Sequence, residues 1–352
     1  WPATMAFTCA ASPLRPSEAI HVNQEGYTSS DYKRAMVGFY LGSGGELNLA
    51  AGTPFTIVDA NTGTTAYSGT LTSRPDVGFT VLPAPYQKVL QADFSSLTAS
   101  GEYCLKVPGL GASLPFLISP SMAMTFARAY ALGLYNQRCG CAVTLPYSRH
   151  EHGACHTAAA SIPVPQASFT NTWSNIVSTN SDYASNPRHT APRLQSQATQ
   201  RYPYVRTGAW DVSGGHHDAG DYSKYTTNSA QLIESLTFAA DSLPGAGDLD
   251  NLGIPESGDG KSDLLQEAKY EADFLAKMQD TDGGFYFLVY PRDRKYEDNV
   301  LPDAGDPQVV FPKTTSATAA AVGALAGLGS SPRFKAQYPA AAASYVAKAQ
   351  AG

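Results

Sequence analysis

The sequence has few charged residues, no concentration of basic ones and no long apolar run. Only 15% of its 352 residues are charged, and 24 Lys and Arg face 30 Asp and Glu, for a net charge of -6. The basic residues form no dense cluster, so we expect no binding to nucleic acid. No stretch approaches the roughly 18 apolar residues of a membrane span, so we expect no membrane partner. Hydrophobic residues make up 43% of the chain. This is enough for sizeable cores, and the length favours two or more domains.

The N-terminus lacks an intact leader sequence. It begins with Trp1 rather than Met, and the first twenty residues contain no basic start followed by an apolar core. They are therefore not a complete secretory signal peptide. We expect them to be what remains after processing or trimming of a longer chain.

Cysteine is scarce and odd in number, which argues against a disulfide framework in a chain of this length. The five cysteines are Cys9, Cys104, Cys139, Cys141 and Cys155. Three of them fall between positions 139 and 155, and six of the seven histidines fall between 150 and 217. This concentration indicates a local site.

Residues 18–119 predict a β-sandwich. They contain short segments rich in Val, Ile, Phe, Tyr and Thr, punctuated by Gly, Pro, Asn or Ser, with a spacing of about 10 to 15 residues. The segments are AMVGFYL, PFTIVDA, TTAYSGTL, GFTVLP, KVLQADFSSL, GEYCLKV and SLPFLIS. No catalytic cluster and no row of aromatic residues is evident among them, so we expect a structural brace.

Residues 120–352 predict an all-helical domain. SMAMTFARAYALGLYNQRC is rich in Ala, Leu and Met at helical spacing, with Ser121 as a plausible N-cap. The polar, proline-containing stretch 157–210 is typical of a long loop insertion. We expect no βαβ alternation and no parallel sheet. Further helices are expected at 222–243, 262–279, 314–328 and 335–351.

The stretch SGGHHDAGDY, residues 213–222, contains the first candidate site. Its carboxylates, Asp218 and Asp221, are three residues apart and directly follow His216 and His217. Paired carboxylates suit the hydrolysis of acetals, because one can deprotonate a water while a separate acid protonates the leaving oxygen. A structural interpretation fits the motif equally well, since Asp221 would also cap a helix that begins in the following residues.

The letters DAGD recur at Asp303–Asp306. This copy is followed by PQVVFP, and neither a glycine pair nor histidines precede it. We expect a surface loop here.

A second candidate site combines thiols and imidazoles, which together suit tetrahedral zinc. The spacing is not that of a zinc finger. Buried thiols beside surface histidines would leave the same pattern, and in a secreted protein a disulfide from Cys155 to Cys139 or Cys141 is the main rival. The candidates are Cys139, Cys141, Cys155, His150, His152, His156, His216 and His217.

The stretch PESGDGKSDLLQE, residues 255–267, is a third candidate. Its alternating Asp, Ser and Gly oxygens are typical of calcium loops, although the EF-hand pattern is not met. A capped helix start explains most of it, with Ser262 as N-cap and Asp263 in the first turn.

Longer blocks of the sequence resemble glycoside hydrolase family 9. VNQEGYTSSDYKRAMV resembles the first strands of the immunoglobulin-like domain that precedes the catalytic module in one branch of that family. The blocks YNQRCG, HGACH, DVSGGHHDAGDYSKY and IPESGDGKSDLLQEAKYEADFLAKMQDTDGGFYF then follow in the family's order. The resemblance runs from about residue 20 to the end.

This resemblance implies a cellulase with an (α/α)6 barrel, which cleaves β-1,4-glucans with inversion. Asp221 is then the general base that activates water, and Asp218 helps to bind and orient that water. His216 and Tyr222 are the implied substrate contacts. Where the family usually has Trp, this chain has His216, which leaves the substrate preference open.

The resemblance also implies a structural zinc held by Cys139, Cys155, His156 and His217, with four protein ligands and no open position. His216 competes with His217 for the fourth place. Such a zinc would brace the loop that holds the aspartates, and calcium is a possible second ion.

The family's general acid is a Glu near the far end of a longer catalytic domain. The resemblance therefore places it outside this chain, and neither Glu256 nor Glu267 is nominated. It further implies that 120–352 is the N-terminal part of the barrel, with a missing C-terminal half as its partner.

Three functions follow as hypotheses, each with a β-1,4-glucan polysaccharide or oligosaccharide as partner. The first is a secreted, inverting endo-β-1,4-glucanase. The second is an exo-acting relative that removes glucosyl or glucosaminyl units, favoured if the stretch 157–210 blocks one end of the cleft. The third is a non-catalytic carbohydrate-binding or structural fragment.

Overall fold

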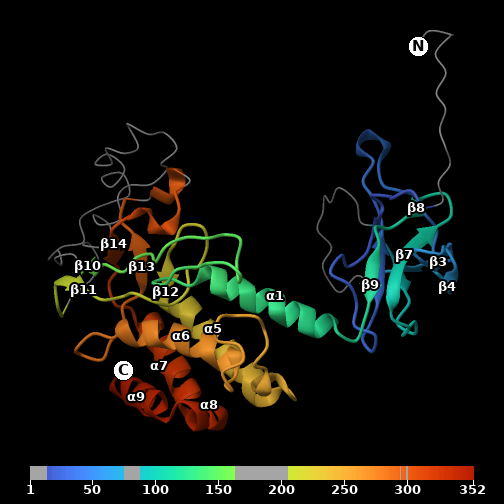
Figure 1. The fold of residues 1–352 in the computed structure, drawn as a ribbon. Helices are drawn as coiled ribbons and strands as arrows, with labels where there is room; N and C mark the ends of the chain where they lie inside the picture. The colour runs from blue at the N-terminus through green and yellow to red at the C-terminus, as the bar shows by residue number, and fades with distance from the viewer. Residues whose placement is uncertain (1–13, 75–87, 163–204, 294, 299) are drawn as a thin grey trace. The chain divides into compact units, whose positions relative to one another are not determined.

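The chain forms two compact units, residues 1–126 and 127–352. The structure is a computed structural model, drawn in Figure 1, and it describes residues 14–74, 88–162, 205–293, 295–298 and 300–352. Helix α1 (Met122–Gln137) begins in the first unit and ends in the second. The boundary predicted between residues 119 and 120 lies in the short link between the last strand of the first unit and α1.

The first unit consists of antiparallel strands in two sheets, in agreement with the predicted sandwich. One sheet has the order β1-β2-β6-β5, and the other has the order β4-β3-β7-β8 with β9 also paired to β7. The segment expected as a strand at 78–83 lies outside the described residues. The elements are β1 (Ile20–His21), β2 (Arg34–Val37), η1 (Gly42–Gly44), β3 (Pro54–Asp59), β4 (Thr65–Thr70), β5 (Thr72–Ser73), β6 (Leu90–Asp93), β7 (Gly101–Val107), β8 (Gly111–Ala112) and β9 (Phe116–Ile118).

Alternation along the strands builds the core of this unit. In β3, Phe55 and Ile57 are buried while Thr56 between them is only partly covered, as expected for a strand with one face toward the core. Tyr27 and Phe94 meet edge to face, with ring centroids 5.1 Å apart. The region has the packed interior of an independent domain.

The second unit is built on helices, as predicted. Helix α5 packs against α6 and α7, and α7 packs against α9. The helix expected at 335–351 is divided in two, because Pro339 starts a new helix at its first position. None of the described helices has both the length and the apolar surface of a bilayer span. Beyond α1, the helices among the described residues are α5 (Thr226–Ser242), η2 (Ala246–Asp248), α6 (Asp263–Lys277), η3 (Lys295–Asp298), η4 (Pro302–Ala304), α7 (Thr315–Ser330), α8 (Pro332–Gln337) and α9 (Pro339–Ala351).

A small sheet, not expected from the sequence, lies over this helical unit. Its strand order is β11-β10-β14-β13-β12, and β10 runs parallel to β14 through Ser161 and Val309. The strands have two to four residues each, which is too short to leave an alternating pattern in the sequence. They are β10 (Ala160–Ile162), β11 (Gly208–Trp210), β12 (Lys224–Tyr225), β13 (Leu288–Pro291) and β14 (Gln308–Val310).

Candidate active site

Two segments far apart in the sequence pair through their backbones and form the frame of the site. The N–H of Cys139 donates to the carbonyl of Gly215, and the N–H of His217 donates to the carbonyl of Gln137, both at 2.7 Å. Arg138 and His216 face each other in an isolated antiparallel bridge. The end of α1 is thereby joined to the residues that precede the paired aspartates.

The glycine pair before the histidines is required by this frame. Gly215 has φ +72, and a Cβ atom there would lie 2.6 Å from Cδ1 of Phe274 on α6. Only glycine combines this backbone conformation with so close an approach. The loop is therefore seated directly on α6.

Four residues predicted as metal ligands converge in the structure. His156 Nδ1 lies 3.2 Å from His217 Nε2. The Cys139 sulfur is 3.7 Å from His156 Nδ1, and the Cys155 sulfur is 3.7 Å from His217 Nε2. All four ligand atoms lie within 4.8 Å of one another. Tetrahedral zinc, with bonds of about 2.3 Å to sulfur and about 2.0 Å to nitrogen, holds its ligand atoms about 3.3–3.8 Å apart. The residues present therefore fit a metal ion of this type.

The described cysteines are all reduced, so the rival disulfide between Cys155 and Cys139 or Cys141 does not form. Cys141, His150 and His152 lie outside the metal-ligand group. His152, for example, directs its Nδ1 toward the carbonyl of Gly153 at 2.7 Å.

Lys224 is a buried partner of the metal ligands that the sequence did not single out. Its ammonium lies 3.3 Å from the Cys139 sulfur and donates to the carbonyls of Val212 and Gly214. The pKa of the Cys139 thiol is held well below its usual range, first by the hydrogen bond from Cys155 and then by the charge of Lys224. A lowered pKa favours the thiolate of Cys139, the form that binds metals.

His216 does not join the metal ligands. Its Nε2 lies 2.9 Å from Oε2 of Glu267, and its Nδ1 lies 2.6 Å from Oε2 of Glu271. Burial alone would lower the pKa of His216, but the two carboxylates outweigh burial and raise it to about 9. The side chain is buried with both nitrogens engaged. The same side chain lines the cavity beside Asp218, so the predicted substrate contact through His216 stays a prediction. Of the two histidines, His217 lies in the group of described residues that could hold a metal.

Both carboxylate oxygens of Asp221 are oriented by hydrogen bonds. Oδ1 accepts from the N–H and the hydroxyl of Ser223, at 3.1 and 2.8 Å. Oδ2 accepts from the hydroxyl of Tyr290 at 2.9 Å. The N-cap position of α5 belongs to Tyr225, so the interpretation of Asp221 as a helix cap is wrong. The side chain is held in place without belonging to a helix.

Asp218 is exposed beside Asp221. Its Oδ1 accepts from Nδ2 of Asn228 at 2.6 Å. Asp218, Asn228 and Tyr225 line a cavity of about 230 Å³, together with His216, His217 and residues of α1, α5 and α6. One carboxylate is thus open to solvent at a hollow in the surface.

Tyr222 adopts the left-handed conformation, with φ 57. Its hydroxyl donates to the carbonyl of Val300 at 2.7 Å, and its ring centroid lies 5.2 Å from that of His217. The predicted substrate contact through Tyr222 stays a prediction, but the structure places its ring against that of a predicted metal ligand.

The second DAGD copy is only partly the surface loop expected. Asp303 is exposed and accepts from the N–H of Gly153 at 2.6 Å. Asp306, however, is buried and accepts from the N–H groups of Asp293 and Lys295, at 3.0 and 2.8 Å. The expectation is wrong for Asp306, because its carboxylate closes a turn of the backbone.

The loop 255–267 leads into α6 as expected, with Ser262 in the N-cap position and Asp263 in the first turn. The Ser262 hydroxyl makes no capping bond. Asp250 accepts from two glycine N–H groups of the loop. One oxygen of Asp263 is buried without a partner. Calcium binding here stays a prediction.

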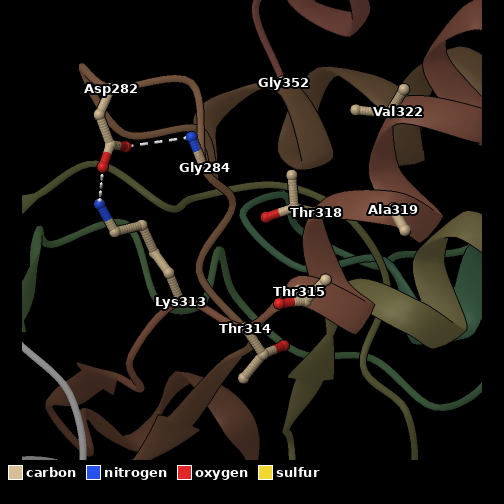
Figure 2. A pocket seen from close by; sticks show the side chains of 9 residues that line it. All are labelled: Asp282, Gly284, Lys313, Thr314, Thr315, Thr318, Ala319, Val322 and Gly352. Atoms are coloured by element: carbon tan, nitrogen blue, oxygen red, sulfur yellow. Dashed lines mark hydrogen bonds and ion pairs between the residues drawn. The ribbon is translucent and has the colours of Figure 1, made fainter.

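A larger pocket, of about 630 Å³, lies at the start of α7 (Figure 2). Lys313 reaches Asp282 across its edge at 2.7 Å, and Thr314, Thr318 and Val322 continue its wall along α7. None of the candidate catalytic or metal-binding residues lines this pocket.

Two family models match the chain. Residues 15–112 match the cellulase N-terminal ig-like domain. Residues 126–352 match glycosyl hydrolase family 9.

Individual relatives agree with these matches. Endoglucanase D from Acetivibrio thermocellus is 29% identical over 286 residues, which is 80% of this chain and 39% of that enzyme. The crystal structure of a metagenome-derived family 9 endoglucanase superposes with a TM-score of 0.69 and 27% identity, over 94% of this chain and 53% of that one. A zinc-binding triple mutant of a family 9 endoglucanase superposes with a TM-score of 0.65 and 27% identity, over 92% of this chain and 51% of that one. The chain thus spans about two fifths of the curated relative's length and about half of the solved chains.

Proposed function

Because this chain belongs to glycosyl hydrolase family 9, with an immunoglobulin-like domain before part of an (α/α)6 barrel, we propose that it serves the hydrolysis of β-1,4-glucans with Asp221 as general base. The observation that carries this role is the orientation of Asp221 from both sides, by Ser223 and Tyr290. A base must be held still and within reach of a water, and Asp221 is fixed without serving as a helix cap.

In this proposal, Asp221 takes a proton from the water that attacks the anomeric carbon. Asp218, held by Asn228 at 2.6 Å, orients the same water. In an inverting glycosidase the base and the acid stand about 6.5–9.5 Å apart, which leaves room for that water.

The general acid is proposed to belong to a segment that these 352 residues do not include. Glu256 and Glu267 are poor candidates, because both bind Arg138 at 2.8 Å. Burial would raise the pKa of Glu267, but His216 and Arg138 lower it. A carboxyl group that stays ionised cannot protonate a leaving oxygen.

Cys139, Cys155, His156 and His217 are proposed to hold one zinc ion. With four protein ligands and no open position, the zinc would cross-link the chain rather than activate water. Its ligands come from the end of α1, from the 155–156 turn and from the residue before Asp218. Because His217 directly precedes Asp218, a zinc ion bound to His217 would also fix the start of the segment that carries both aspartates. The unpartnered oxygen of Asp263 is the feature that supports the calcium prediction.

Cleavage within the glucan chain is proposed over exo action, because similar proteins reported above are endoglucanases. The stretch 157–210, on which the exo hypothesis depends, lies mostly outside the described residues. Secretion is proposed because a β-1,4-glucan polymer is met outside the cell.

The test compares reducing-sugar release from a soluble β-1,4-glucan by the 352-residue chain, its Asp221→Asn variant and its Asp303→Asn variant. Asp303 opens the second DAGD copy and serves as the matched control. Because the general acid is proposed to lie outside these residues, we expect the parent and the control to release sugar slowly, about 10²–10⁴-fold below an enzyme that contains its acid. Asp221→Asn should release about 100-fold less than the parent. A fast fall in viscosity indicates internal cleavage. Glucan binding without release, unaffected by Asp221→Asn, would instead support the non-catalytic hypothesis.

A further inference from the structure

The paired segments of the site have two faces, and only one of them carries the proposed metal. Arg138 and His216 face each other in the antiparallel bridge, so their neighbours Cys139 and His217 point to the opposite side. The metal ligands Cys139 and His217 therefore stand on one face of this pair. Arg138 and His216 extend from the other face toward α6.

Both of these side chains end on one carboxylate, that of Glu267 on α6. Arg138 binds it through two nitrogens, with NH2 to Oε1 at 2.8 Å and Nε to Oε2 at 3.2 Å. His216 adds its Nε2 to Oε2 at 2.9 Å. A single side chain thus holds the residue before one metal ligand and the residue before another.

The surroundings make this arrangement rigid. The side chains of Arg138, His216 and Glu267 are 4%, 5% and 2% exposed, so all three are shielded from bulk solvent. The Tyr270 ring lies under the Arg138 guanidinium, whose carbon is 4.7 Å from the ring centroid. Glu271 holds the other side of His216 through both the ring and the backbone N–H. Removing one partner of such a buried charged group leaves the others unsatisfied.

We propose that Glu267 is a positioning residue for the metal site, which sets the placement of Cys139 and His217 through Arg138 and His216. This inference rests on the proposed metal site and adds a residue that touches none of its ligands. A metal site needs its ligand atoms within a few tenths of an ångström of the geometry that the ion requires. Residues that do not touch the ion commonly hold the ligands in that geometry. Here the partners of Glu267, Arg138 and His216, lie on the face of the paired segments opposite to Cys139 and His217.

The test measures zinc affinity by competition with a chromophoric chelator, together with the visible spectrum of the cobalt-substituted protein. In Glu267→Gln the amide oxygen can take the place of Oε2, which accepts from both Arg138 and His216. The NH2 group that replaces Oε1 cannot accept from NH2 of Arg138, so that contact breaks and the negative charge is lost. We expect zinc affinity to fall about tenfold or more, and the cobalt bands to shift or weaken.

Two control variants separate this role from general stabilisation. Glu256 is the outer partner of Arg138, and the Glu256 side chain is 37% exposed. Glu256→Gln weakens only this outer contact and should keep the parental zinc affinity within about twofold. Phe334→Leu opens a cavity in the core at α8 and should lower the melting temperature without changing zinc affinity.

A double-mutant cycle with His216→Gln tests the route and remains informative if Glu267→Gln alone folds poorly. If Glu267 acts through His216, its removal costs less affinity in the His216→Gln background than in the parent. Glu267→Gln with parental affinity and spectrum overturns the inference, as does an equal loss in Phe334→Leu. If the parent binds neither zinc nor cobalt, the proposed metal site itself fails, and this inference fails with it.

Discussion

Tyr290 donates its hydroxyl to Oδ2 of Asp221 at 2.9 Å, which ties strand β13 to the loop of the paired aspartates. The opposite oxygen of Asp221 is taken by Ser223. Asp221 thus cannot rotate without losing partners on one side. The Tyr290 hydroxyl also lies 2.9 Å from that of Tyr296, so the orienting group is itself held.

Replacing Tyr290 with Phe should lower kcat about tenfold and leave KM nearly unchanged. The change removes one hydrogen bond to a charged group, which contributes about 1.5 kcal/mol, without removing the ring. Steady-state kinetics on 2,4-dinitrophenyl β-cellobioside, which needs no general acid, measure both constants. Tyr296→Phe is the control and should have a smaller effect, because Tyr296 bonds to the Tyr290 hydroxyl, one step further from Asp221. A purely structural role for Tyr290 would raise KM and lower stability together.

Lys224→Met should weaken zinc binding about 10- to 100-fold. The ammonium lies 3.3 Å from the Cys139 sulfur and also holds the carbonyl of Gly214, so its removal loosens both the ligand and its loop. Chelator competition measures the change. Lys277→Met is a suitable control, because Lys277 contacts Ser213 but no metal ligand. Equal affinity in the parent and Lys224→Met would show that Lys224 only fills space.

Chelation should lower the melting temperature of the helical unit, and added zinc should restore it. An ion that binds only the folded state, at a free concentration 1,000 times its Kd, stabilises by about 4 kcal/mol. Calorimetry with and without a chelator measures the shift. Cys155→Ser should abolish the zinc response, whereas Cys141→Ser should keep it, because Cys141 lies outside the metal-ligand group. A zinc response that survives Cys155→Ser would contradict the ligand assignment.

Asp280 should make the helical unit sensitive to acid. Burial would raise the pKa of its carboxyl group, but Lys313, the Thr281 N–H and the Tyr286 hydroxyl together lower it. A lowered pKa means that the folded state binds this proton less readily than the unfolded state. The stabilisation is therefore present above the unfolded pKa of about 3.9 and is lost as the pH falls through the folded value.

Asp280→Asn should accordingly cost about 2 kcal/mol in free energy of unfolding at pH 7, with the difference from the parent shrinking below about pH 4. Urea unfolding across pH measures it. Asp282→Asn removes a carboxylate that shares Lys313 but is 47% exposed, and should cost under about 1 kcal/mol. A deficit in Asp280→Asn that stays constant down to pH 3 would contradict the assignment.

Local patterns were sufficient to predict the helices of the second unit and the strands of the first. Short clusters of cysteine, histidine and aspartate indicated the paired aspartates and eight possible metal ligands. The resemblance to glycoside hydrolase family 9 then reduced the eight to four. The role of His216 was not predictable in this way. Its partners, Glu267 and Glu271, read as ordinary acidic residues of an amphipathic helix, and only the folded structure buries them.

Tyr290 and Asn228 were missed for a related reason. Tyr290 reaches Asp221 across 69 residues from a four-residue strand, and no local pattern marks such a contact. Asn228 stands near the start of a helix, where asparagine is common. Asn228 lies in the first turn of α5, three residues after Tyr225, and from there it donates to Asp218. Its position in that first turn is the feature of the sequence that could have indicated this contact.

The most direct test of the central claim is the release of dinitrophenolate from 2,4-dinitrophenyl β-cellobioside by the 352-residue chain. This leaving group departs without being protonated, so the reaction needs a base and a water but no general acid. The account predicts release by the parent and by Asp303→Asn, and a rate about 100-fold lower in Asp221→Asn. Equal release by the parent and Asp221→Asn, or none above the uncatalysed rate, would contradict the assignment of Asp221 as the base.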